Sequence, residues 1–138
     1  MFPAGEWPLH ITVVPPFEWD GTTEELVSAI PRGPRIPVVA GERAQLGSRR
    51  AVEVTLIEPS EALLAAHVTV VDALEAAGAR IRDRAHIRDG YRPHATVQRS
   101  GMLHPGESAI VDAWSLVDRA PEGMRGFRRV VARLPLAP

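Results

Sequence analysis

The sequence predicts an α+β protein whose sheets are mainly antiparallel. Three observations lead to this fold class: short β-rich runs bounded by Gly and Pro, two stretches with helical spacing of apolar residues, and no strict alternation of strands with helices. A chain of 138 residues is the size of one domain, so we expect residues 1–138 to form a single domain. The hydrophobic and charged fractions, 45% and 24%, are those of a globular protein rather than of a disordered chain.

The first predicted elements are a strand and a short helix. Residues 9–14 are rich in Leu, Ile and Val and predict a strand that ends at Pro15, because proline cannot donate to a ladder and restricts the residue before it. Residues 22–30 predict a helix, since Thr22 is followed three residues later by Glu25, which is the capping-box pattern, and a proline follows the segment.

The rest of the chain predicts five strands and one long helix. The strands are expected at residues 36–40, 51–57, 94–98, 109–117 and 127–134. The helix begins at Ser60 and ends before Gly78, which provides a C-terminal stop. Between these two residues the apolar side chains recur at helical spacing, as at Leu63, Val70 and Leu74.

The composition excludes several kinds of chemistry. Cysteine is absent, which excludes disulfides, thiolate nucleophiles and cysteine-based metal sites. The N-terminal residues show no basic region followed by an apolar run, and no window approaches the length of a membrane span. We therefore expect a cytoplasmic protein without membrane contact, whose chemistry comes from His, Ser, Thr, carboxylates or Arg.

The basic residues are unevenly distributed. The net charge is −1, and all sixteen basic residues are Arg. Six of them fall within residues 80–99, where only Asp83 and Asp89 oppose them: Arg80, Arg82, Arg84, Arg88, Arg92 and Arg99. The planar guanidinium suits phosphate oxygens, so one interpretation is a segment that meets an anionic ligand. The alternative interpretation is a solvated loop.

One short motif occurs in two of the predicted strands. His10 and Thr12 lie in PLHITVV, and His94 and Thr96 lie in RPHATVQ, eighty-four residues later. Side chains alternate across a strand, so each His shares a face with its Thr, while the apolar residues between them take the other face. Each strand therefore has an apolar side for the core and a polar side that is available for chemistry.

The pattern His-x-Thr occurs a third time, at His67 and Thr69, within the predicted long helix. Residues two apart in a helix point about 200° away from each other, so these two side chains cannot act on one ligand from a shared face. We therefore interpret His67 as a structural residue of the helix.

Two histidines with two threonines suit the chemistry of a phosphodiester. Imidazole has an ordinary pKa of about 6.5, so one ring can act as a base while the other acts as an acid, without a metal or another cofactor. One histidine would accept a proton from water, the other would protonate the leaving oxygen, and the threonine hydroxyls would donate to the nonbridging oxygens. A metal site is less well supported, because no third ligand stands at a useful spacing, and no G-x-S-x-G motif indicates a serine hydrolase.

At HITVVPPF and PHATVQR, which contain the two motifs, the sequence resembles the 2H phosphoesterase superfamily, in particular its 2′-5′ RNA ligase-like branch. The resemblance implies a bilobal α+β fold, in which two pseudo-symmetric lobes with antiparallel sheets surround a central groove and the helices lie outside. It also implies metal-independent hydrolysis or ligation of 2′,3′-cyclic or 2′-5′-linked phosphodiesters. By position, His10 and His94 become the catalytic pair, with Thr12 and Thr96 as phosphate ligands.

The expected partner is a nucleotide or an RNA end, and we favour a monomer. Four residues near the motifs are predicted to contact this substrate: Phe17, Tyr91, Arg92 and Arg99. Phe17 and Trp19 are equally well explained by packing in the core, and Arg99 falls on the strand face opposite His94. The alternative to an enzyme is a non-catalytic module that binds nucleotides or RNA in the same groove, with an affinity that falls steeply with salt.

The residues ahead of the first motif are few. Members of the family usually carry a strand and further residues there, whereas nine residues precede His10 in this chain. We therefore expect that the sheet of the first lobe is either shortened or completed by a neighbouring chain.

Overall fold

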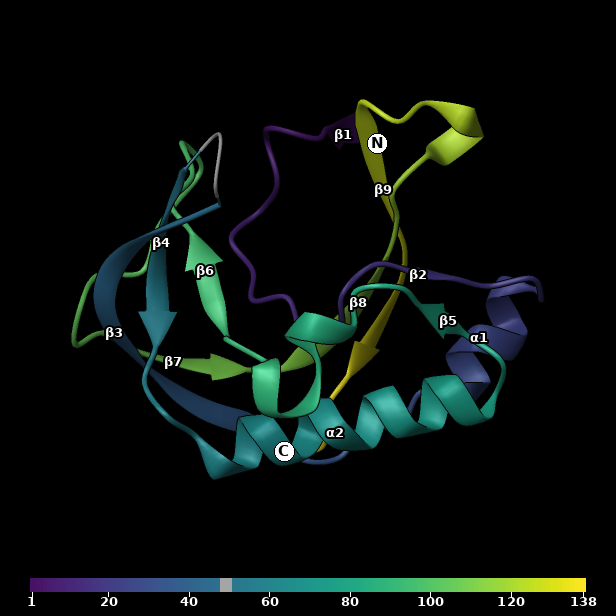
Figure 1. Cartoon of the computed structure of the whole chain (residues 1–138), viewed down its shortest axis with the longest axis horizontal. Coiled ribbons are helices and arrows are strands. Elements are labelled where there is room, and N and C mark those ends of the chain that lie inside the picture. The colour runs from purple at the N-terminus through teal and green to yellow at the C-terminus, as the bar shows by residue number, and fades with distance from the viewer. Residues whose placement is uncertain (48–50) are drawn as a thin grey trace.

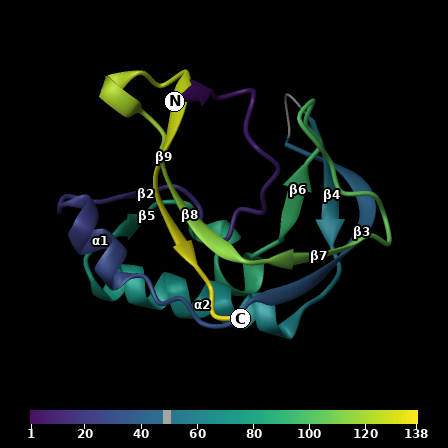
Figure 2. The ribbon, with the colours of Figure 1, turned by 180° about the vertical axis from the view of Figure 1, so that it is seen from behind.

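The computed structural model describes residues 1–47 and 51–138 of the chain. Two antiparallel sheets stand beside each other, and the long helix α2 (Glu61–Ala76) runs beneath both of them (Figure 1). The short helix α1 (Thr23–Ala29) lies near one end of α2, and the view from behind shows the same arrangement (Figure 2). The α+β class with antiparallel sheets is therefore confirmed, and the helices lie on the outside.

The larger sheet carries the second of the two motifs. Its strand order is β6 (His94–Thr96), β4 (Val52–Ile57), β3 (Ile36–Leu46) and β7 (Ser108–Val111), and every neighbouring pair is antiparallel. β6 is thus an edge strand of this sheet. The N-terminal segment passes along the free edge of β6 in both views (Figure 1, Figure 2).

The second sheet is formed by the two ends of the chain. Its strand order is β1 (Phe2–Pro3), β9 (Phe127–Pro135) and β8 (Ala113–Asp118), and it is antiparallel throughout. The residues ahead of the first motif thus contribute only a two-residue strand at the edge of this sheet. A separate antiparallel pairing joins β2 (Phe17–Glu18) to β5 (Arg80–Ile81).

Both α-helices begin where the sequence predicts them. The hydroxyl oxygen of Thr22 accepts a hydrogen bond from the backbone N–H of Glu25 at 3.1 Å, and that of Ser60 accepts one from Leu63 at 3.1 Å. Three single-turn 3-10 helices complete the described elements: η1 (Arg84–His86), η2 (Arg88–Gly90) and η3 (Pro121–Gly123). In the part of the chain that the structure describes, no helix has the length and apolar character needed to cross a membrane.

The main core lies between α2 and the two sheets. Leu63, Val70 and Leu74 stand on one side of the helix and are each at most 6% exposed. They pack with buried residues of both sheets, among them Val38, Ala40, Ile57, Ala95, Trp114 and Leu134. Burial of one large aliphatic side chain stabilises the fold by about 1.5–3 kcal/mol, so this core fixes the sheets relative to each other.

Two of the predicted strands do not form as predicted: one is not a strand, and the other is divided into two strands. Within the fully described residues 9–14 the only pairing is an isolated bridge at Ile11, because the segment crosses from the second sheet to the edge of β6 and touches that edge at one point. The predicted strand 109–117 is interrupted at Asp112 and becomes β7 and β8. The reason is that β7 pairs with β3 while β8 pairs with β9, so the chain changes sheets there.

Candidate active site

A single β-bridge brings the two motifs side by side. Ile11 pairs antiparallel with Ala95 of β6, although the two residues are far apart in the sequence. Ala95 is 1% exposed, and Ile11 packs against the same main core. The middle residue of each motif therefore faces the core, and the residues that flank it face the other way, because side chains alternate along an extended chain.

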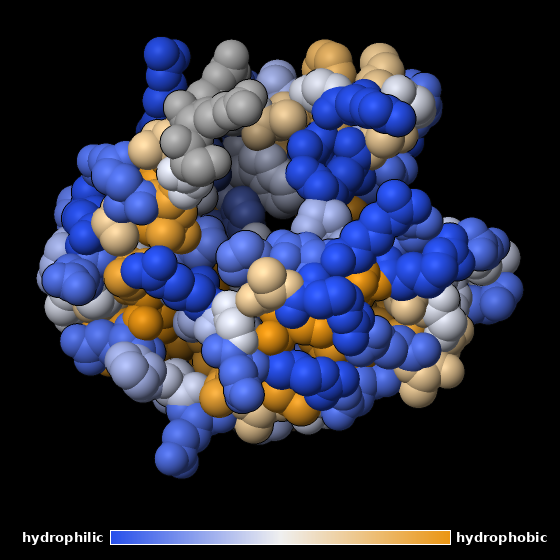
Figure 3. Space-filling model, in the orientation of Figure 1, coloured by the Kyte–Doolittle hydropathy of each residue, from blue (hydrophilic) through white to orange (hydrophobic). Residues whose placement is uncertain are grey.

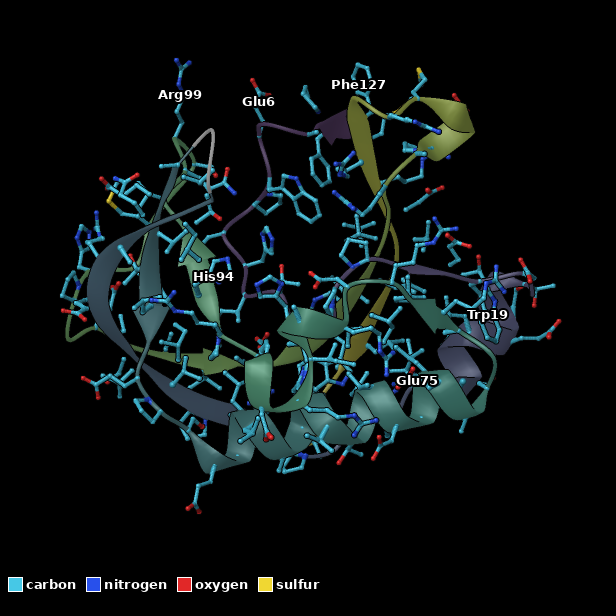
Figure 4. All side chains as sticks on the ribbon, in the orientation of Figure 1. Glu6, Trp19, Glu75, His94, Arg99 and Phe127 are labelled. Atoms are coloured by element: carbon cyan, nitrogen blue, oxygen red, sulfur yellow. The ribbon has the colours of Figure 1, made fainter. Side chains whose placement is uncertain are left out.

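The flanking residues are the histidine and the threonine of each motif. Antiparallel register about the bridge sets His10 across from Thr96 and Thr12 across from His94. Thr12 is exposed and the other three residues are half-buried, so each of the four has surface open to a ligand. The two histidines are diagonal neighbours, and the residues of such a pair lie about 7–8 Å apart. Figure 4 labels His94 on β6, on the side of the sheet that adjoins the N-terminal segment.

Each of the two imidazoles is oriented by the backbone just before it. Nδ1 of His10 lies 2.7 Å from the carbonyl oxygen of Pro8, and Nδ1 of His94 lies 2.8 Å from the carbonyl oxygen of Arg92. A carbonyl oxygen only accepts hydrogen bonds, so in the neutral rings the hydrogen is on Nδ1 and Nε2 keeps its lone pair. In both motifs Nε2 is therefore the atom able to take up or deliver a proton.

An aromatic residue precedes each histidine by three positions. The repeat thus extends to WPLHIT, which begins at Trp7, and YRPHAT, which begins at Tyr91. The Trp7 ring stacks on the His10 ring, with centroids 4.5 Å apart and planes 29° apart. Sequence reasoning missed Trp7, and its spacing from the histidine, repeated at Tyr91, is the signal that could have found it.

Trp7 is in turn held by the second sheet. The Phe2 ring meets the Trp7 ring edge-on at 5.8 Å, and the guanidinium carbon of Arg128 lies 5.7 Å from the centroid of the Trp7 ring. Arg128 is 9% exposed, and its Nη1 donates to three backbone carbonyl oxygens. The Trp7 ring therefore connects His10 to β1 and β9.

The third His-x-Thr pair does not join the other two. His67 is buried in α2 and Thr69 is exposed, as helix geometry predicts for residues two apart. Burial lowers the pKa of His67; its hydrogen bond to the carbonyl of Val13 opposes that effect, and the charge of Arg88 adds to it. His67 nevertheless contacts the first motif, since Nδ1 donates to the backbone of Val13 and the Tyr91 ring stacks on the imidazole.

The predicted substrate contacts lie in different places. Phe17 packs against the core and lines a shallow hollow that contains none of the four motif residues; the rest of its lining is Pro16, Glu18, Arg80, Arg82 and Asp83. The Tyr91 hydroxyl donates to the carbonyl oxygen of Thr12 at 2.9 Å, and burial raises the pKa of this tyrosine. Arg92 is exposed beside the second motif. Arg99 lies beyond the end of β6 and points away from the molecule (Figure 4).

Most arginines of residues 80–99 form ion pairs. Arg80 pairs with Glu18 and Asp20, Arg82 with Glu18, Arg84 with Glu75, and Arg88 with Asp72 and Glu75. The carboxylates come from β2, the loop after it and α2, and not from the arginine-rich segment itself. Among the described residues, Arg92 and Arg99 form no ion pair, so these two are the arginines of the segment whose charge no carboxylate offsets.

The surface between the two sheets is open and polar. Figure 3 shows a hollow there, with hydrophilic residues over much of the surface around it. Across residues 1–47 and 51–138, no group of three or more His, Asp or Glu side chains is placed to hold a metal ion.

A comparison with protein families settles the family of the chain. The profile of the 2′-5′ RNA ligase superfamily matches residues 3–120, a range that contains both motifs and both α-helices. The chain belongs to the 2′-5′ RNA ligase superfamily. Membership in the 2′-5′ RNA ligase superfamily confirms the resemblance seen in the sequence and supports an enzyme of the phosphoesterase kind.

A solved crystal structure of a phosphoesterase is similar to this member of the 2′-5′ RNA ligase superfamily. The TM-score is 0.54 and the sequence identity 18%, over 94% of this chain and 78% of that chain. At this identity the likeness concerns the fold, and it agrees with the two antiparallel sheets and the outer helices. No curated protein matched the sequence.

Proposed function

We propose that the protein is a metal-independent phosphodiesterase that acts on 2′,3′-cyclic or 2′-5′-linked phosphodiesters of RNA or nucleotides. The observation that carries the proposal is the bridge between Ile11 and Ala95, because it puts the polar faces of the two motifs together. Membership in the 2′-5′ RNA ligase superfamily supports an activity of this kind. His10 and His94 are the proposed acid–base pair, and Thr12 and Thr96 are the proposed phosphate ligands.

In the proposed reaction one histidine takes up a proton and the other histidine releases one. Nε2 of the neutral histidine accepts a proton from water as the water oxygen attacks phosphorus. Nε2–H of the protonated histidine donates to the ribose oxygen as the bond from that oxygen to phosphorus breaks. The product is a phosphate monoester, and the two histidines have exchanged protonation states. Both Nε2 atoms are available because Nδ1 of each ring is bonded to a carbonyl oxygen.

The threonines act on the charge that develops in the transition state. Each threonine stands across from the histidine of the other motif, so Thr12 and Thr96 flank the space between the two imidazoles. Their hydroxyls donate to the two nonbridging oxygens, where negative charge accumulates. Removal of one preorganised donor of this type has slowed other enzymes by about 10²–10³.

Among the predicted substrate contacts, Arg92 is the best supported. It is exposed, stands two residues before His94, and has no ion pair among the described residues. Its planar guanidinium is suited to a phosphate or to the edge of a base. Phe17 lines a hollow that contains no motif residue and Arg99 points away from the molecule, so both are proposed as contacts for more distant parts of a longer RNA. The Tyr91 hydroxyl contacts the protein.

Product analysis tests the proposal. The protein is incubated with 2′,3′-cyclic nucleotides and with 2′-5′-linked dinucleotides, with and without EDTA, and the ribose oxygen that keeps the phosphate is identified. We expect turnover that EDTA does not change, a single phosphate position in the product, and a bell-shaped dependence on pH. Turnover that EDTA abolishes would contradict the mechanism. Binding that weakens with salt but leads to no turnover would instead indicate a non-catalytic nucleotide- or RNA-binding module.

A further inference from the structure

Both ring nitrogens of His67 are engaged with the protein. The residue is 0% exposed and lies near the middle of α2. Nδ1 lies 2.5 Å from the carbonyl oxygen of Val13, and Nε2 accepts a hydrogen bond from the backbone N–H of Arg88 at 2.8 Å. Only the neutral ring with its hydrogen on Nδ1 satisfies both partners. In a protonated ring Nε2 would also carry a hydrogen, and this N–H would face the backbone N–H of Arg88.

Tyr91 extends the contact to the neighbouring peptide. Its ring lies flat on the imidazole of His67, with centroids 3.9 Å apart and planes 5° apart. Its hydroxyl donates to the carbonyl oxygen of Thr12 at 2.9 Å. The consecutive carbonyl groups of Thr12 and Val13 are therefore each held by one of two stacked side chains.

The backbone held in this way has little support from a sheet. Of residues 9–14, all of which the structure describes, only Ile11 takes part in a β-bridge. A slip of one residue in an extended pairing turns every side chain to the opposite face, so it would turn His10 and Thr12 toward the core. The two carbonyl contacts just after Ile11 oppose such a slip.

The loop that contains Arg88 and Tyr91 is attached to α2 by contacts of Arg88. Arg88 has a φ of 56°, in the left-handed region that residues other than glycine seldom adopt. Its N–H donates to His67, and its guanidinium pairs with Asp72 and Glu75, which also belong to α2. Strained backbone persists where surrounding contacts impose it, and it is a reason to look for a functional constraint.

We propose that His67 and Tyr91 form a clamp, the His67–Tyr91 clamp, that holds the first motif in register with the second. Both are positioning residues for His10 and Thr12, because they contact the motif through its backbone. The proposal rests on the proposed function to the extent that the two motifs carry out the reaction.

Three variants test the clamp by steady-state kinetics on a 2′,3′-cyclic nucleotide. Tyr91→Phe keeps the stacked ring and removes only the hydrogen bond to Thr12, while His67→Leu removes both contacts of the imidazole. His67→Gln keeps one donor and one acceptor. We expect kcat to fall roughly tenfold in Tyr91→Phe and roughly 100-fold in His67→Leu, with KM nearly unchanged, because small displacements of reacting groups are costly. His67→Gln should recover most of the loss.

Trp114→Phe is the matched control for a structural effect. It removes another buried aromatic donor, since the indole N–H of Trp114 donates to the carbonyl oxygen of Pro31 at 3.0 Å, and that contact involves neither motif. We expect kcat to stay at the wild-type value even where the free energy of unfolding falls. A folded His67→Leu variant with wild-type kcat would overturn the clamp, and so would an equal loss of kcat in Trp114→Phe.

Amide hydrogen exchange tests the clamp without a substrate. The clamp predicts faster exchange at residues 10–14 in Tyr91→Phe than in the wild type, with exchange along α2 unchanged. If the wild type shows no turnover but exchange changes in this way, the proposed function fails and the clamp stands. If the wild type turns over and Tyr91→Phe changes neither kcat nor exchange, the clamp fails and the proposed function stands.

Discussion

The indole ring of Trp7 lies on the imidazole ring of His10, whereas the equivalent aromatic residue of the second motif, Tyr91, lies on His67. The two halves of the repeat thus share a sequence pattern but not the packing of their aromatic residues. The backbone hydrogen bond of Nδ1 to a carbonyl orients both catalytic candidates, and only His10 has an aromatic residue of its own motif against its ring. The stack therefore restricts the orientation of the His10 ring, and with it the direction in which Nε2 points.

The first prediction concerns this stack. Trp7→Leu removes the aromatic face, and aromatic pairs contribute about 0.5–1.5 kcal/mol beyond their buried area. If that energy orients the reacting ring, kcat should fall by about two- to tenfold, because about 1.36 kcal/mol corresponds to a factor of ten. Trp7→Phe should lose less, and Trp114→Phe should lose nothing. An unchanged kcat in Trp7→Leu would mean that the backbone bond alone orients His10.

The second prediction concerns the two histidines as a unit. His10→Ala and His94→Ala should each lower kcat by at least about two orders of magnitude, because each removes one proton transfer from the same step. The double variant should lose little more than the worse single variant, since residues that act together are strongly non-additive. His104→Ala, a change at an exposed histidine outside the motifs, is the control. Losses that multiply in the double variant would show that the two histidines act independently.

Much of the fold follows from local physics and was predictable for that reason. The hydroxyls of Thr22 and Ser60 cap the two helices, and a cap depends only on the three residues that follow it. The shared face of each His and Thr follows from the two-residue period of an extended chain. One bridge, at Ile11, is enough to preserve that face even though the predicted strand around it did not form.

The features that sequence reasoning missed depend on partners far away in the chain. The residues of the first motif have high β-propensity, but a strand needs a neighbour along its length, and this segment meets β6 at one residue. The carboxylates that pair with the arginines of residues 80–99 include Asp20 and Glu75, which a charge count within that segment omits. Helix geometry predicted that His67 is structural, but its contact with Val13 arises from tertiary packing.

The third prediction concerns the pH dependence of stability. Burial lowers the pKa of His67 in the folded state below its ordinary value of about 6.5, and Arg88 adds to this effect. Below about pH 6.5 the unfolded chain therefore binds a proton at this residue that the folded chain does not bind. The free energy of unfolding thus rises with pH through that window. This contribution is full above about pH 6.5 and is lost as the pH falls further.

His67→Gln isolates this contribution, because glutamine does not titrate. Urea unfolding of the wild type and of the variant, at about pH 5 and about pH 8, gives the loss of stability on acidification for each. The loss should be smaller in the variant. Arg88, whose charge lowers the pKa of His67, and its ion-pair partners Asp72 and Glu75 are present in both proteins, so their effects largely cancel. Equal losses in the two proteins would exclude His67 as the titrating group.

The fourth prediction concerns Gly90, in the loop that leads to the second motif. A Cβ built at Gly90 would overlap the carbonyl oxygen of Ala85, and a backbone atom cannot swing aside as a flexible side chain does. Gly90→Ala must therefore displace the loop that carries Arg88 and Tyr91, and we expect a loss of about 1–3 kcal/mol in the free energy of unfolding.

A displaced loop should also weaken the His67–Tyr91 clamp, so kcat should fall in Gly90→Ala at temperatures where the variant is still folded. Gly126→Ala is the control, since a Cβ at Gly126 meets no atom within 4 Å and the change should stay within about 0.5 kcal/mol. If Gly90→Ala is as stable and as active as Gly126→Ala, the loop before the second motif is free to relax, and its shape does not determine the position of the first motif.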